Sequence, residues 1–172
     1  MKSLLRLGKL HRLKENVMSN KIQVECKEGM TEPSWISSVS PFVEKVLAYL
    51  EIDQWELSVL FCDDPFIRNL NNEYRKIDAP TDVLSFEQGD EYIDEDDVTW
   101  FNAGDIVISL DSLQANSQYF NETPNVELKR LLIHGILHLD GQDHENNDSD
   151  QEMLQLQERI LLVFINDIVF KE

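Results

Sequence analysis

The sequence predicts an α/β (α+β) fold, in which helices cover a single small mixed β-sheet. Segments that alternate apolar and polar side chains, which is typical of strands, are separated by longer segments with helical periodicity. Their predicted order is strand, helix, strand, helix, two strands and then helices, as in a mixed sheet packed against helices. The length of 172 residues suits one domain with a substantial core.

The first strand and helix follow from side-chain periodicity. Residues 21–26 alternate in polarity, which predicts a half-buried strand. Residues 34–50 have an apolar face at helical spacing. Pro41 interrupts this segment. Since proline is favoured in the first turn of a helix, we expect the helix to begin near it, with Ser40 as the cap.

A second strand and a second helix are predicted at residues 55–61 and 65–74. The strand alternates in polarity and is rich in residue types that favour sheets. Asp63 or Asp64, directly before a proline, indicates where the helix is capped. Residues 75–81 are expected to form a loop.

Two further strands, at residues 82–86 and 104–110, flank an acidic segment. Residues 87–97 contain seven acidic side chains and no basic one. Such a segment could bind a cation, but like charges repel, so an exposed loop is favoured. We expect the two strands to pair as a hairpin with a long connection. A helix follows at residues 111–119.

Two helices complete the predicted fold. Thr123, followed by a proline, indicates the start of a helix at residues 124–140. Asp148 is expected to cap the last helix, which runs to about Phe170. Residues 160–165 of that helix are apolar all round, so we expect them to pack into the core.

The segment LLIHGILHLDGQDH, residues 131–144, contains three of the four histidines of the chain. His134 and His138 are four residues apart, so a helix places both imidazoles on one face. Gly141 can adopt the left-handed conformation that ends a helix, and the turn can bring His144 back towards them. Three neutral nitrogen ligands that leave a fourth position open for water are typical of a catalytic zinc site.

The histidine pattern allows two other interpretations. A single histidine on an apolar helix is usually a hydrogen-bonded core residue, whereas three with a glycine at the turn favour a metal site. The offsets also match the H-E-x-x-H-x-x-G-x-x-H pattern of metzincin peptidases. Gly135 stands where those enzymes have the glutamate that acts as general base, so the metal scaffold matches and the peptidase chemistry does not.

Three blocks of sequence resemble one known family. HGILHLDGQDH, residues 134–144, resembles the H-G-x-L-H-L-x-G-x-D-H signature of the YbeY family, metal-dependent endoribonucleases of bacterial ribosomal RNA maturation. NEYR at residues 72–75 with PTDVLSF at residues 80–86, and GDIVIS at residues 104–109, resemble two further blocks of that family in the same order. The resemblance covers about residues 20–165.

The resemblance implies one zinc ion per chain, held by His134, His138 and His144. It also implies a catalytic role for Arg75, which matches the arginine of the family's tyrosine–arginine pair; spacing alone would make it a surface residue. A guanidinium fits phosphate oxygens and can stabilise the charge of a transition state. Asp143 could orient a histidine or cap the turn.

The function implied by the resemblance is a zinc-dependent endoribonuclease, specific for single-stranded RNA, that acts in ribosomal RNA processing and ribosome maturation at the 3′ end of the small-subunit RNA. The implied partners are ribosomal RNA and the small ribosomal subunit with its proteins, without a membrane, and the implied location is the cytoplasm. Two alternatives remain open, a metzincin-like peptidase or amidase, and a non-catalytic ribosome-associated factor with structural zinc. A fourth protein ligand would favour the last. The sequence does not indicate an oligomeric state.

Composition sets limits on these functions. The formal net charge of −18 argues against nucleic-acid binding over the whole surface, although it allows a local basic cleft or a partner that supplies RNA affinity. Cys26 and Cys62 are interpreted as reduced thiols rather than as a disulfide framework. No apolar run approaches the roughly 18 residues needed to span a bilayer.

The N-terminus differs from the rest of the chain. Residues 1–17 carry five basic side chains against one acidic side chain, with leucines every three residues. This pattern could be a transit peptide or a membrane-surface helix. We expect instead that residues 1–20 are an extension outside the fold, with Met18 as the true start, and that residues 21–172 form a single metal-dependent endoribonuclease domain. His11 would then lie outside the metal site.

Overall fold

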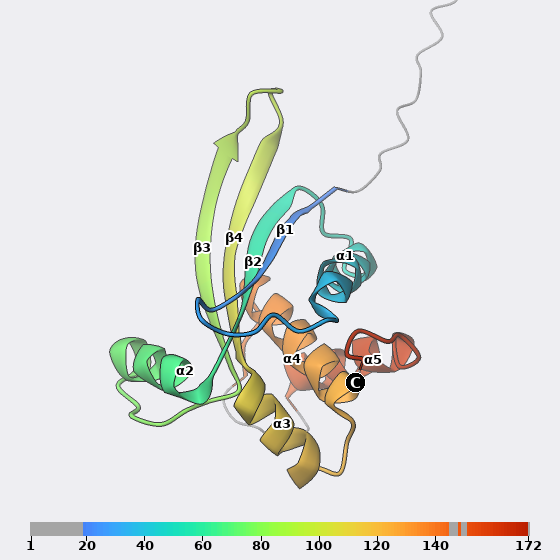
Figure 1. Cartoon of the computed structure of the whole chain (residues 1–172). Coiled ribbons are helices and arrows are strands. Elements are labelled where there is room, and N and C mark those ends of the chain that lie inside the picture. Colours follow the sequence, from blue (N-terminus) through green and yellow to red (C-terminus); the bar gives the residue numbers. More distant parts are fainter. Residues whose placement is uncertain (1–18, 145–147, 149–150, 172) are drawn as a thin grey trace, which may run out of the picture.

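A mixed sheet of four strands forms the centre of the computed structural model, which describes residues 19–144, 148 and 151–171 (Figure 1). The strand order is β1-β2-β4-β3. β1 and β2 are parallel, as are β2 and β4, whereas β3 and β4 are antiparallel. The predicted mixed sheet is therefore confirmed. The strands span Lys21–Cys26 (β1), Trp55–Cys62 (β2), Val83–Ile93 (β3) and Thr99–Ser109 (β4).

Five α-helices accompany the sheet in the described part of the chain. Two of them begin at caps that the sequence indicated: the Asp63 side chain accepts a hydrogen bond from the amide of Phe66, and that of Thr123 from the amide of Val126. The helices span Val39–Tyr49 (α1), Asp64–Leu70 (α2), Leu110–Tyr119 (α3), Pro124–Leu139 (α4) and Glu152–Val163 (α5).

The start of α1 differs from the prediction. A 3₁₀ turn, Ile36–Ser38, runs directly into the helix, and Ser38 rather than Ser40 is the residue before it. Pro41 still lies in the first turn, where its missing N–H costs no intrahelical hydrogen bond. The 3₁₀ turn already has helical backbone angles, so the α-helix can begin before the proline.

A single π-helical turn, Asn71–Arg75, extends α2. Lys76 follows it with a left-handed backbone (φ +62°) and ends the helical segment. Arg75 was expected at the start of a loop, but it is the last residue of this wider turn. Such turns are rare, and they are frequent at functional sites.

The two faces of the sheet carry different layers. Alternate residues of β2, among them Leu57, Val59 and Phe61, belong to the main core, which α1, α4 and α5 complete. The opposite face is smaller, and Ile67 of α2 packs there against Leu84 with residues of β2 and β4. In Figure 1, α4 and α1 lie together on one side of the strands, and α2 lies at the opposite side.

The acidic segment is mostly strand, so the expected long loop is wrong. β3 continues to Ile93, and only residues 94–98 connect it to β4. Asp94 closes this turn, since its carboxylate accepts hydrogen bonds from the amide of Val98 and from the Trp100 indole. The segment is exposed, as expected. An edge hairpin tolerates acidic side chains because most of them point into water.

The last helix is shorter than predicted. α5 begins after Gln151, not at Asp148, and ends at Val163. Lys129 explains why α5 ends at Val163. Its fully buried ammonium donates hydrogen bonds to the carbonyl oxygens of Phe164, Ile165 and Asp167 at 2.8–3.0 Å. These bonds hold the chain in a non-helical path beyond the helix.

The prediction that residues 160–165 pack into the core holds only in part. Ile160 and Leu161 are buried, whereas Leu162, Val163 and Ile165 are exposed. Only one face of α5 is covered by the rest of the domain.

The N-terminal prediction concerns residues 1–20, of which residues 1–18, including His11, lie outside the described residues. Of the neighbouring residues, Ser19 donates its backbone N–H to Asp53, and the Asn20 side chain accepts from the amide of Trp55. None of the described helices is long and apolar enough to cross a membrane.

Candidate metal centre

Helix α4 and the turn after it bring three histidines together. His134 and His138 lie one turn apart on the same face of α4. Gly141 has φ +75° and donates its N–H to the carbonyl of His138, which reverses the chain and places His144 beside the other two. Each histidine offers one ring nitrogen, and these three atoms lie within 4.8 Å of one another. No other group of this kind occurs among the residues that the structure describes.

Two of the imidazoles, those of His134 and His138, are suited to bind a divalent metal ion because burial holds them in the neutral form. Burial lowers the pKa of His134 to about 4, despite a hydrogen bond from its ring to Gln157. Burial also lowers the pKa of His138, and the neighbouring His144 and Arg75 act in the same direction. Neutral imidazoles have a free lone pair at neutral pH, so the donor set fits a metal ion.

Gln157 of α5 contacts the ring of His134 on the side away from the other two histidines. Its Oε1 lies 2.8 Å from Nδ1 of His134, and the residue is only 6% exposed. Sequence analysis missed this residue. A signal existed, because Gln157 lies four residues after Met153 and four before Leu161 on the buried stripe of α5, where a polar residue is unusual.

Asp143 caps the turn rather than orienting a histidine. Its carboxylate accepts a hydrogen bond from the backbone N–H of His144 at 2.8 Å. The distance from the same carboxylate oxygen to Nδ1 of His138 is 3.9 Å, too long for a hydrogen bond. The geometry therefore supports a capping role for Asp143.

The histidines line a cavity of about 800 Å³ that also contains Arg75, brought there by the π-helical turn. The cavity lies between the start of β3, α3, α4 and α5. Its other lining residues are Thr81, Asp82, Val83, Ser85, Asn116, Phe120, Glu122, Glu127, Arg130, Leu131, Asp143, Leu154 and Gln157.

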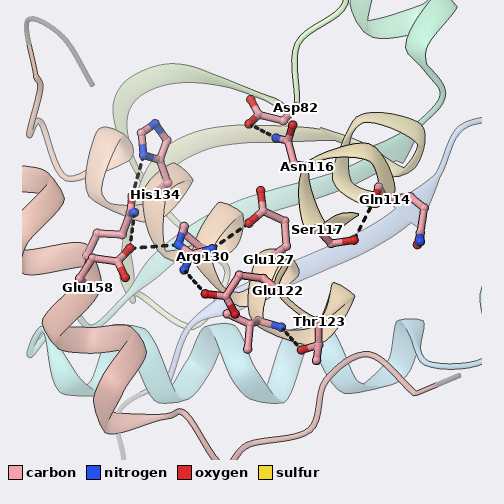
Figure 2. Close-up of polar contacts among 12 residues, drawn as sticks. Asp82, Gln114, Asn116, Ser117, Glu122, Thr123, Glu127, Arg130, His134 and Glu158 are labelled. Atoms are coloured by element: carbon pink, nitrogen blue, oxygen red, sulfur yellow. Dashed lines mark hydrogen bonds and ion pairs between the residues drawn. The ribbon is translucent and has the colours of Figure 1, made fainter. Parts of the chain in front are cut away.

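The two arginines of the cavity differ in their partners. Arg130 contacts three carboxylates, those of Glu127 at 2.8 Å, Glu158 at 3.0 Å and Glu122 at 3.7 Å (Figure 2). Arg75 is exposed and makes no hydrogen bond or ion pair with any described residue. Arg75 is therefore the guanidinium available to a ligand.

Other basic residues near the site are already engaged. Arg68 forms a two-pronged ion pair with Asp78 at 2.7 and 2.9 Å, and the Lys76 ammonium donates to the carbonyl of Glu73. Lys129 is buried away from the cavity. These contacts favour Arg75 over its neighbours as a phosphate contact.

Gly135 faces the sheet, not the cavity. A Cβ atom at this position would lie 2.7 Å from Cγ2 and 2.8 Å from Cδ1 of Ile106 on β4. Glycine thus allows α4 to pack closely on the sheet. A glutamate here would point into the core, which explains why the metzincin base has no place in this site.

Ser85 and Asp105, which belong to the family-like segments at residues 80–86 and 104–109, lie in different surroundings. Ser85 lines the cavity, and its buried Oγ has no hydrogen-bond partner among the described residues. Asp105 lies outside the cavity and accepts a hydrogen bond from Ser58 on the neighbouring strand. Asp105 is thus engaged within the sheet, whereas the Ser85 hydroxyl is not.

Comparisons with known proteins agree with one another. A family model described as Endoribonuclease YbeY matches residues 21–164. A protein named Endoribonuclease YbeY from Treponema denticola is 52% identical over 157 residues, covering 90% of this chain and 99% of the relative. One of the same name from Treponema pallidum, strain Nichols, is 55% identical over 142 residues, covering 83% and 88%.

A solved structure extends the likeness to the fold. The solution structure of TM1509 from Thermotoga maritima superposes with a TM-score of 0.57 at 28% sequence identity, covering 84% of this chain and 90% of that one. Sequence, fold and the arrangement of the histidine motif thus lead to one conclusion: the chain belongs to the endoribonuclease YbeY family.

Proposed function

We propose that this protein is a zinc-dependent endoribonuclease that cleaves single-stranded RNA. In this proposal His134, His138 and His144 hold one zinc ion per chain, and Arg75 binds the phosphate at the scissile bond. The names of the relatives support the reaction class. The observation that carries the proposal is that three imidazoles share a cavity with a guanidinium that has no ion-pair partner among the described residues.

The histidines would act as a fixed set of ligands. Two of them belong to a buried helix and the third to a tight turn capped by Asp143, so little ordering is needed when the ion binds. A zinc ion held there would supply a Lewis acid for the phosphoryl group and lower the pKa of a water molecule. Three protein ligands leave room for both roles.

Arg75 would supply the positive charge that the substrate requires. Negative charge increases on the phosphoryl oxygens during hydrolysis, and a preorganised cation lowers the barrier. The guanidinium can contact two phosphate oxygens at once. Because its side chain has no described partner to release, binding a phosphate costs it no ion pair.

The charge of the cavity makes RNA binding dependent on the metal. Four carboxylates and two guanidinium groups line it, so the metal-free cavity has a net negative charge. A divalent cation would balance the excess of two carboxylates. A phosphodiester would therefore enter the loaded site far more readily than the empty cavity.

The proposed substrate is ribosomal RNA, processed near the 3′ end of the small-subunit RNA, in the cytoplasm. The three sequence blocks of the YbeY family support this assignment. With a net charge of −18, the protein needs a further source of RNA affinity. We propose that the small ribosomal subunit and its proteins supply it.

Structural observations weigh against the two alternatives. Position 135 faces Ile106, so a peptidase base cannot be placed as in metzincins. A structural zinc ion would require a fourth protein ligand, and the described residues offer three histidines without a further ligand group.

The test combines metal content with RNA cleavage. Purified protein should contain about one zinc per chain by elemental analysis, and it should cut a labelled precursor of small-subunit RNA unless a chelator is present. His134→Ala, His138→Ala and His144→Ala should each lose most of the metal and the activity, whereas His11→Ala should lose neither. Stoichiometric zinc in a His134→Ala/His138→Ala double variant would rule out the assignment.

A further inference from the structure

We infer that a relay of side chains from Arg130 through Glu158 and Gln157 sets the tautomer of His134, so that its Nε2 carries the free lone pair and faces the other histidines. Gln157 is then a positioning residue of the site. The functional meaning of this relay rests on the proposed metal centre, but the tautomer itself can be measured without any metal.

The orientation of the Gln157 amide decides the tautomer. Its Nε2 lies 3.0 Å from the Glu158 carboxylate, and its Oε1 lies 2.8 Å from Nδ1 of His134. An ionised carboxylate only accepts hydrogen bonds, so the NH₂ group must face Glu158. The carbonyl oxygen then faces His134 and can only accept. Nδ1 must therefore carry the proton, which leaves Nε2 bare.

Arg130 and Glu127 hold the outer end of the relay. Nε of Arg130 donates to the same Glu158 oxygen at 3.0 Å, and its Nη1 donates to Glu127 at 2.8 Å (Figure 2). Glu127 is 3% exposed, so this end of the relay is anchored in the domain. The relay leaves α4 at Arg130, crosses to α5 and returns to α4 at His134.

The geometry of the histidines agrees with this assignment. Nε2 of His134 lies 3.1 Å from Nε2 of His138, so the bare nitrogen points to the centre of the cluster. A ligating histidine whose other nitrogen donates to a fixed acceptor is held in orientation and is more basic. Loss of such an acceptor typically weakens metal binding about 10- to 100-fold.

The direct experiment is NMR of the full chain labelled with ¹⁵N-histidine, freed of metal and measured at pH 7.5. Two-bond ¹H–¹⁵N correlations distinguish the tautomers. Wild-type His134 should show a protonated Nδ1 and a bare Nε2. Gln157→Leu should remove this preference, whereas Gln157→Glu should keep it, because a carboxylate also accepts from Nδ1. A protonated Nε2 on wild-type His134 would overturn the inference.

Zinc affinity, measured by competition with a chromogenic chelator, gives a second readout. Gln157→Leu should bind zinc about 10- to 100-fold more weakly, and Gln157→Glu should bind within a few-fold of wild type. Gln155→Leu, the same substitution at an exposed position of α5, is the matched control. A folded Gln157→Leu protein with the wild-type tautomer and affinity would contradict the relay.

A variant at the exposed end of the relay covers the case in which Gln157→Leu does not fold. The Glu158 side chain is 49% exposed, so Glu158→Ala should fold, free the Gln157 amide to turn over and give a mixture of His134 tautomers. An unchanged tautomer would remove Glu158 from the relay. If the wild type shows the expected tautomer but cleaves no RNA, the proposed function fails and the relay stands.

Discussion

Gly135 and Ile106 are in such close contact that a single added carbon at position 135 would lie 2.7 Å from the isoleucine side chain. This contact sets the distance between α4, which carries two of the histidines, and β4 of the sheet. The position of the candidate metal centre over the sheet thus depends on a residue without a side chain.

Gly135→Ala should destabilise the protein. Alanine gains up to about 1 kcal/mol in helix propensity, but overpacking a dense core costs about 1–3 kcal/mol. We therefore expect a net loss in the free energy of unfolding, measured by urea denaturation. In an Ile106→Ala background, which removes the clashing atoms, the same change should cost less or stabilise. An equal cost in both backgrounds would show that the contact is not responsible.

Gly135→Glu should not create a peptidase. The new side chain would enter the core beside Ile106 and not reach the cavity, so the protein should lose stability and show no hydrolysis of casein or of a fluorogenic peptide. Peptide hydrolysis by the wild-type chain would instead support the peptidase alternative.

Arg75→Ala should abolish most RNA cleavage while leaving zinc content and melting temperature unchanged. Loss of one preorganised donor typically costs on the order of a hundredfold or more in rate. Arg75→Lys should recover only part of the activity, since an ammonium keeps the charge but cannot donate two parallel hydrogen bonds to a phosphate. Arg68→Ala is the matched control, because Arg68 is a nearby exposed arginine already paired with Asp78.

The outcome for Arg75 separates three roles. Zinc lost in step with activity would make Arg75 structural. Full activity in Arg75→Ala would remove it from catalysis. Equal losses in Arg75→Ala and Arg68→Ala would indicate a general effect of surface charge on RNA binding.

The metal-free protein should lose stability as the pH falls from about 6.5 towards 4. Burial lowers the pKa of His134 to about 4, whereas the unfolded chain has the ordinary value of 6.5. Between these values the unfolded chain binds the proton and the folded one does not. The resulting contribution of His134 to the free energy of unfolding is fully present above pH 6.5 and amounts to about 3 kcal/mol at most.

Comparison with His134→Asn isolates this contribution. Burial raises the pKa of Glu127, so protonation of Glu127 stabilises the folded protein as the pH falls, which opposes the effect of His134. Wild type and variant share the Glu127 effect, so it cancels in the comparison. Urea unfolding at pH 7.5, 6.0 and 5.0 should give a shallower pH dependence for the variant. Parallel curves would show that His134 is not protonated on unfolding.

A chain that begins at Met18 should fold and keep its metal. We propose that residues 21–172 form the domain, and the described contacts of Ser19 and Asn20 are retained in this truncation. The melting temperature should change little. Asn20→Ala, by contrast, should destabilise by about 1 kcal/mol, because Asn20 accepts from the amide of Trp55. A large fall in melting temperature on truncation would place the preceding segment within the fold.

The parts of the site that local sequence determines could be predicted. The Thr123 cap, the spacing of His134 and His138 and the glycine at the turn all act within a few residues, so α4 and the approach of His144 follow from the sequence. The order of strands and helices along the chain also follows in outline, since a repeat of two residues distinguishes a strand from a helix.

The remaining features depend on contacts between distant segments. Gln157 reaches His134 only because α5 packs on α4, 23 residues along the chain. The end of α5 depends on the buried Lys129, which reads as an ordinary surface lysine in the sequence. The extent of β3 was missed because charge repulsion indicated a loop, whereas pairing with β4 stabilises the strand.

The π-helical turn at Asn71–Arg75 has a consequence for insertions and deletions. A π-helical turn contains about one residue more than an α-helical turn, and each residue of an α-helix rotates the next by about 100°. Deleting one residue from this turn would restore an α-helix and point the guanidinium of residue 75 away from the cavity. No hydrogen bond or ion pair with a described residue holds the Arg75 side chain, so its direction depends on the number of residues in the turn.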